Sequence, residues 1–228
     1  MITTQCPAAA QLTTITQQKC AEDFGQIQKL IFQRLRTDNN EPNGFATTSG
    51  AATSVHIDVN VLSGVQTLLS VTTSQKIVVS PYIEAPTSEA GDARTSGGGN
   101  DSLNGIETLV GANPSTFTAQ IRSQKQSVIK NMKALMGEAK AHNLGVYLVN
   151  ENGQIGGIDG VTEYGETGCN LAPIPVELLF IGDKAFGGFE APDANTISWS
   201  FRPQWSDNFV VVKPTGYNPL TALDVFAS

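Results

Sequence analysis

Few residues of this chain have the types and spacing that catalysis requires. Glu163 and Glu166 could in principle divide the acid and base roles between them, as the paired carboxylates of glycosidases do. Both lie in the Gly-rich segment 160–168, where charged residues are most often solvated loop residues. We therefore assign them no catalytic role.

Residues suited to metal binding or nucleophilic catalysis are equally few. The chain contains two histidines, His56 and His142, and three cysteines, Cys6, Cys20 and Cys169, with no CxxC pair and no zinc-like spacing. The GxxxxGK[ST], GxSxG, HExxH and DxDxDG patterns are absent, and no GxGxxG leads from a strand into a helix. We predict free thiols, no catalytic residue, no metal and no cofactor, and therefore a protein that is not an enzyme.

Composition and charge narrow the function further. The 228 residues suit one large domain, and the low charged fraction of 15% leaves a surface of mainly uncharged polar groups. The net charge of -7 argues against non-specific binding to nucleic acid. Residues 144–228 hold 10 acids and 3 bases, whereas residues 1–143 hold 11 of each, so the net negative charge is C-terminal. Without a signal-like start or an apolar run of about 18 residues, we expect folding in a cytoplasm and no membrane partner.

The hydrophobic pattern predicts a mainly β fold. For residues 25–35 a helical face also fits, but strand is favoured, and residues 55–61 alternate strictly, with His56, Asp58 and Asn60 on a wet face. Asn152-Gly153 is a strong hairpin signal. The other predicted strands are 76–80, 144–150, 154–158, 175–181, 196–201 and 208–213. We predict a β-sandwich or barrel with one flanking amphipathic α-helix and long loops.

The predicted helix spans about 123–142, with Ser123 as N-cap and Asn143 in the left-handed C-terminal position. Its apolar residues recur at helical spacing, and its opposite face carries Lys125, Lys130, Lys133 and Lys140. Membrane or calmodulin binding would suit a basic amphipathic helix, but packing on a sheet is favoured.

The predicted domain, residues 25–228, follows an N-terminal arm at residues 1–24 that is poor in apolar residues. Within the domain, residues 84–105 contain Gly97-Gly98-Gly99 and few apolar side chains. We predict a long mobile loop there, which either becomes ordered against a partner or stays flexible.

The order of these features resembles the virion structural proteins of tailed bacteriophages, and in layout it is most similar to the major tail tube proteins. The resemblance rests on the polar arm, the Gly-rich loop, the single helix, the hairpin and the final segments 201–208 and 213–220. It implies a β-barrel or sandwich flanked by a helix, assembled as hexameric rings that stack into a tube. The implied partners are copies of the chain, other virion proteins and DNA that passes without specific binding, in a virion assembled in the cytoplasm of a host bacterium.

An acidic lumen would repel phosphate and keep passing DNA from sticking. The candidate lumen-facing acids are Glu151, Asp159, Glu163 and Glu166, which lie in or beside Gly-rich turns. For the same reason, the lysines of the predicted helix are expected to face away from the lumen.

Two alternatives stay open. A capsid decoration, neck or tail-terminator protein would have much the same composition, and a carbohydrate-binding β-sandwich would depend on exposed aromatic residues. Trp199 lies on an apolar strand face and is interpreted as core, whereas Trp205 is a candidate interface residue.

Overall fold

The structure is a computed structural model that describes residues 15, 24–189 and 192–224. The predicted N-terminal arm, together with Cys6 and Cys20, falls almost entirely outside the described residues. The elements are β1 (Ile27–Arg34), β2 (Phe45–Ala46), β3 (Ile57–Asp58), α1 (Leu62–Ser70), β4 (Ile77–Val79), β5 (Glu84–Glu89), β6 (Ala93–Gly97), the 3-10 turns η1 (Gly99–Asp101) and η2 (Leu103–Gly105), β7 (Glu107–Ala112), β8 (Ser115–Arg122), α2 (Gln126–Lys140), β9 (Leu144–Asn150), β10 (Ile155–Ile158), α3 (Gly160–Tyr164), β11 (Ile174–Ile181), β12 (Ala194–Phe201), β13 (Phe209–Val212) and α4 (Pro219–Ala222).

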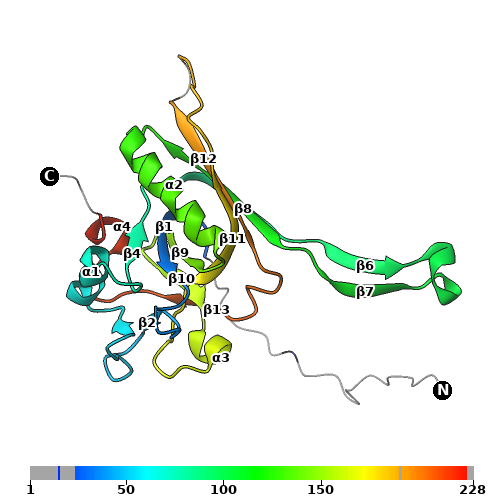
Figure 1. Cartoon of the computed structure of the whole chain (residues 1–228), viewed down its shortest axis with the longest axis horizontal. Helices are drawn as coiled ribbons and strands as arrows, with labels where there is room; N and C mark the ends of the chain where they lie inside the picture. The colour runs from blue at the N-terminus through cyan, green and yellow to red at the C-terminus, as the bar shows by residue number, and fades with distance from the viewer. Residues whose placement is uncertain (1–14, 16–23, 190–191, 225–228) are drawn as a thin grey trace.

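The protein is mainly β and is built on one large antiparallel sheet (Figure 1). The sheet follows the order β13-β10-β9-β11-β12-β8-β5, and β1 and β4 branch from β9. One edge of β9 pairs with β1 along the strand, while its other edge pairs first with β11 and then with β10. The sheet therefore divides at β9 into two parts that enclose a core.

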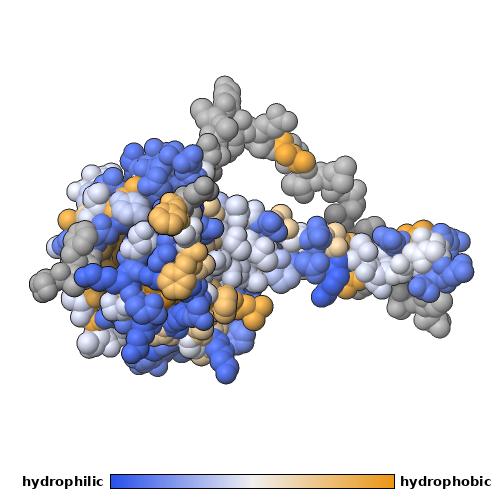
Figure 2. All heavy atoms as spheres, turned by 90° about the horizontal axis from the view of Figure 1, so that it is seen from above, coloured by the Kyte–Doolittle hydropathy of each residue, from blue (hydrophilic) through white to orange (hydrophobic). Residues whose placement is uncertain are grey.

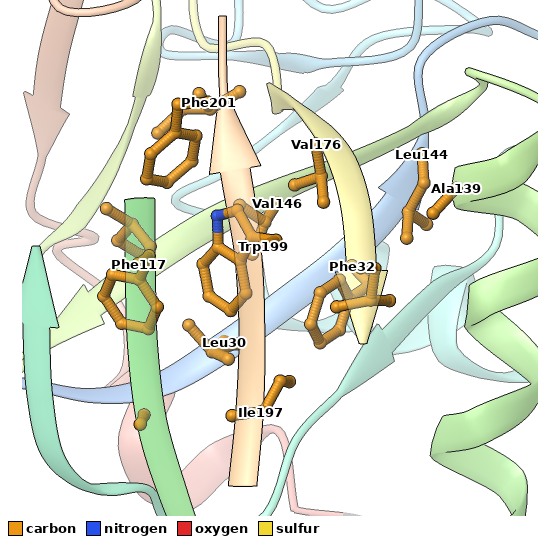
Figure 3. Packing of buried hydrophobic residues seen from close by; sticks show 14 of the residues in the cluster. Leu30, Phe32, Phe117, Ala139, Leu144, Val146, Val176, Ile197, Trp199 and Phe201 are labelled. Atoms are coloured by element: carbon orange, nitrogen blue, oxygen red, sulfur yellow. The ribbon is translucent and has the colours of Figure 1, made fainter. Parts of the chain in front are cut away.

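Strands β1 and β9 are buried nearly throughout because both of their faces are covered. Leu30 and Phe32 of β1 belong to a cluster with β8, β11, β12 and α2. Ile31 belongs to a second cluster with α1 and α4. Figure 3 shows Trp199 of β12 between Phe117 and Phe32, and its ring stacks on Phe117 with centroids 4.1 Å apart. These rings join the two parts of the sheet, as expected for a sandwich-like core.

Most predicted strands are confirmed, as is the Asn152-Gly153 hairpin, in which Gly153 adopts the positive φ of such turns. The helix predicted at about 123–142 is present as α2, which buries Ile129, Met132 and Ala139. Its predicted ends are wrong. Ser123 has a positive φ outside the helix and does not cap it, and His142 takes the left-handed position predicted for Asn143. The short helices α1, α3 and α4 were not predicted.

The strand predicted at residues 55–61 is wrong. Only Ile57–Asp58 form a short parallel pair with β2, and His56 and Asp58 are buried where a wet face was expected. The Thr53 hydroxyl accepts from the His56 N–H (2.9 Å), and the Asp58 carboxylate accepts from the Asn60 N–H (2.9 Å). Such local side-chain bonds turn the chain and satisfy polar groups, so the strand pairing is not continued.

The C-terminal helix α4 is tied to the sheet by a buried lysine. Lys29 of β1 is 1% exposed, donates to the Leu220 carbonyl and forms an ion pair with Asp224. Its ammonium also lies 4.1 Å from the centroid of the Tyr82 ring, whose hydroxyl donates to the same Leu220 carbonyl (3.1 Å). Because Tyr82 comes two residues before β5, this cluster joins the C-terminal segment to the start of β5.

Candidate assembly surface

A long β-hairpin projects from the rounded body of the molecule (Figure 1). It spans residues 84–122, where β5 pairs with β8 and β6 pairs with β7. The prediction of a long loop without strands at residues 84–105 is therefore wrong, because that segment forms one side of the hairpin and its tip. The prediction considered only one side and missed the β-forming run Thr108-Leu109-Val110 in the opposite strand.

The hairpin has an anchored base and a free end. Strand β8 pairs with β12 along its whole length, and Phe117, Ala119 and Ile121 point into the core. Beyond this base, β6 and β7 form a separate two-stranded sheet. We call residues 90–114 the distal arm. At about 3.3 Å per residue, its roughly ten residues per strand extend about 30 Å.

Glycines shape the distal arm. At the tip, Gly97, Gly98 and Gly99 all have positive φ, so the triglycine turns the chain and does not act as a linker. The Ser102 hydroxyl closes this turn by accepting from the Gly98 N–H (2.9 Å) and donating to the Ile106 carbonyl (2.7 Å). Where the arm leaves its base, a Cβ on Gly91 would overlap the backbone carbonyl of Asn113. The arm's shape is therefore specified by its sequence.

The distal arm exposes large apolar side chains to solvent. Four of them are at least 53% exposed: Leu103, Ile106, Leu109 and Val110. A lone two-stranded ribbon is marginally stable in water, and its outer edges offer unpaired N–H and C=O groups. Apolar side chains and open strand edges in one projecting element are the features of a surface that a partner covers.

A second set of exposed apolar side chains lies on the body, along the end of β11 and the loop that follows it. We call it the Phe patch; its members, each at least 57% exposed, are Leu178, Phe180, Phe186 and Phe189. The pairing of β11 with β12 shifts register between Glu177 and Phe180, and Leu178 has a positive φ, as at a β-bulge. The loop that follows β11 is held by an ion pair from Lys133 of α2 to Asp183. The loop that carries Phe186 and Phe189 is therefore in contact with the lysine-bearing helix.

The four acids predicted from sequence do not form one cluster. Asp159 caps α3 by accepting from the Val161 N–H (3.1 Å), and Glu163 of α3 accepts from the Asn208 amide (3.2 Å). Glu166 follows on the same segment, while Glu151 lies in the turn at the opposite end of β10. The structure thus groups three of the acids around α3 and separates the fourth. Their lumen-facing role stays a prediction.

Trp205 extends the core. It is half-buried, stacks on Phe201 with centroids 4.4 Å apart and meets Phe209 edge-on at 5.7 Å. Its role at an interface stays a prediction. Trp199 is buried, as its strand position predicted.

A histidine and a cysteine that could have taken part in catalysis, His56 and Cys169, are buried in the fold. His56 is buried, with Nε2 3.1 Å from the Pro42 carbonyl oxygen. Burial, reinforced by the nearby charges of Glu166 and Asp159, raises the pKa of the Cys169 thiol to about 12, so the nucleophilic thiolate is disfavoured. Across residues 15, 24–189 and 192–224, no group of three or more His, Cys, Asp or Glu side chains could hold a metal ion. Within the same ranges, no helix has both the length and the apolar character needed to span a bilayer.

Comparison with solved structures gives distant likenesses. No protein-family model and no curated protein matches the sequence. A chain from the tail of an empty GTA particle with C6 symmetry is 8% identical, with a TM-score of 0.30 over 57% of this chain and 81% of that one. A chain from the six-fold symmetrised baseplate of the anti-feeding prophage is 9% identical, with a TM-score of 0.33 over 86% of this chain and 99% of that one.

Proposed function

We propose that this chain is a structural subunit of a phage-type virion whose copies assemble through the β-hairpin arm. In its finer form, the proposal is a tail tube of stacked hexameric rings that conducts DNA. The observation that carries it is the distal arm, residues 90–114, which projects from the body with exposed apolar side chains. The chain is proposed to be a building element that catalyses no reaction and holds no cofactor.

The arm gives assembly a driving force of useful size. Burying a Leu, Ile or Val side chain stabilises a contact by about 1.5–3 kcal/mol when the side chain starts fully exposed. Since the four apolar side chains of the arm are between half and nine-tenths exposed, covering them contributes about 5 kcal/mol per arm. One such contact is weak after the entropy cost of association, but repetition around a ring and between rings multiplies it.

The charge of the chain is compatible with a conduit for DNA. The net charge of -7 disfavours retention of the polyanion, and the excess acids are concentrated in the C-terminal part. Glu163, Glu166 and Asp159 around α3 are proposed to contribute to a repelling lumen. Electron microscopy can measure the number of subunits in each ring and identify the surface that faces the lumen.

Negative-stain electron microscopy of the purified full-length chain tests this proposal. Hollow tubes of regular bore are expected, whereas closed single rings would indicate another virion component, such as a terminator. The double variant Leu109→Ser/Val110→Ser should fold and stay monomeric. A matched control, Val61→Ser/Val161→Ser, removes two exposed valines from other surfaces and should assemble. A wild-type chain that stays monomeric at high concentration contradicts the proposal.

A further inference from the structure

We propose that the distal arm of one copy docks across the lysine-bearing side of α2 and the adjoining Phe patch of a second copy. The inference rests on the proposed function and names the surface that receives the arm. It follows from charge, from apolar exposure and from the direction in which the arm points.

The distal arm combines apolar side chains with negative charge. Residues 90–114 hold three acids, Asp92, Asp101 and Glu107, and one base, Arg94. Among the described residues, none of these three carboxylates forms an ion pair. The tip acids Asp101 and Glu107 flank Leu103 and Ile106, so the surface of the tip is both apolar and acidic.

The receiving surface has the complementary character. Lys125, Lys130 and Lys140 are exposed on or beside α2, and none of them forms an ion pair in the part of the chain that the structure describes. Lys130 lies one helical turn before Lys133, whose partner Asp183 is three residues from both Phe180 and Phe186. Unpaired positive charge and exposed aromatic rings thus lie on two elements that the Lys133–Asp183 ion pair joins.

The arm cannot cover this surface within its own chain. In Figure 1 the arm extends away from the body, and its tip is far from both α2 and the loop between β11 and β12. Figure 2 shows apolar side chains among hydrophilic ones on the body and again along the projecting arm. Two complementary surfaces on one chain that cannot meet each other define a head-to-tail contact between copies, which generates rings or filaments.

The two kinds of contact have separate tasks. The apolar side chains of the arm and the Phe patch supply most of the affinity. The acids and lysines exclude wrong registers, because facing like charges destabilise a contact. Charge reversal on one side should therefore weaken docking, and reversal on both sides should restore it.

A charge swap tests the inference. The arm variant is Asp101→Lys/Glu107→Lys, the helix variant is Lys125→Glu/Lys130→Glu, and the third protein carries all four changes. Sedimentation velocity over a concentration series measures the concentration at which assemblies form. Each two-site variant should raise it about tenfold or more, and the four-site protein should return to within about threefold of wild type.

The matched control reverses an exposed lysine in the segment that follows β13. Lys213→Glu makes the same change in net charge as Lys130→Glu alone and should leave the assembly concentration unchanged, whereas Lys130→Glu should raise it. The helix variant should fold normally, because acids near a helix N-terminus are favourable. If wild type assembles and the arm's apolar variant does not, but the charge swap fails to restore assembly, the docking surface is wrong and the proposed function stands. A helix variant that assembles at the wild-type concentration also overturns the docking surface, and a monomeric wild type overturns both proposals.

Discussion

The buried ion pair between Lys29 and Asp224 gives the sharpest test of the fold around the arm's base. Asp224→Asn keeps the size of the side chain but removes its charge. Lys29 is 1% exposed, so its ammonium cannot recover water and keeps the Leu220 carbonyl, the Tyr82 ring and a neutral amide oxygen in place of the carboxylate. Lys29→Met instead removes the buried charge and leaves Asp224, whose side chain is 22% exposed, in reach of solvent.

The two single variants should therefore lose different amounts of stability. Breaking a buried pair so that a charge stays buried costs about 3–5 kcal/mol. Because the new amide oxygen still accepts from Lys29, we expect a loss just below this range, about 2–3 kcal/mol, for Asp224→Asn. Lys29→Met should cost about 1 kcal/mol, since the Leu220 carbonyl keeps the Tyr82 hydroxyl as a donor. For a domain of this size these losses correspond to falls in Tm of about 8 °C and about 3 °C.

Thermal unfolding of the two single variants and the double variant is the assay. The double variant Lys29→Met/Asp224→Asn should be more stable than Asp224→Asn alone, because it contains no buried unpaired charge. As a control, Asp183→Asn removes the exposed partner of Lys133 and should leave Tm unchanged. Strictly additive losses in the double variant, or an unchanged Tm for Asp224→Asn, would refute the reasoning.

Two further predictions concern the arm and alkaline pH. Gly91→Ala should bend the arm and abolish assembly while the body keeps its circular dichroism spectrum, because its Cβ would overlap the Asn113 carbonyl. Gly111→Ala, in the same arm, should assemble normally, because its Cβ would meet only the end of the flexible Arg94 side chain, at 4.0 Å. Equal behaviour of the two variants would count against a defined arm shape. Burial raises the pKa values of Cys169 and Tyr164 to about 12, so the folded chain holds these protons at a pH where the unfolded chain has released them. Stability should therefore be constant up to about pH 9 and fall as pH rises toward 12, as measured by urea unfolding; a midpoint that does not change over this range would contradict the assigned burial.

The sequence was most informative where one physical signal dominated. Alternation in Ile197-Ser198-Trp199-Ser200-Phe201 predicts a half-buried strand, and burial of its three apolar residues agrees. The periodic apolar residues of α2 predict a helix for the same reason. In both cases, the burial of one face decides the local structure.

The same reasoning failed where local hydrogen bonds or distant pairing decided. Residues 55–61 alternate like a strand, but the Thr53 and Asp58 side chains turn the chain there. Residues 84–105 have too few apolar side chains to predict order. Their strands exist because β5 extends the paired base formed by β8 and β12, a long-range relation that composition does not contain.

The candidate site was only partly accessible from the sequence. The sequence predicts at residues 84–105 a loop that either becomes ordered against a partner or stays flexible, which covers part of the arm but not its form, and contact with a partner stays a prediction. The Phe patch was missed because Phe180 lies within an apolar strand, and its outward direction follows from the register shift after Glu177. A bulge of this kind has no distinctive sequence signal.

A cryo-electron microscopy map of the assembled full-length chain tests the central claim most directly. The account predicts a repeating, hollow assembly in which residues 90–114 of each copy lie against α2 and the Phe patch of a neighbour. A map in which the arm stays in solvent between subunits joined by other surfaces, or a sample that contains only monomers, would contradict it.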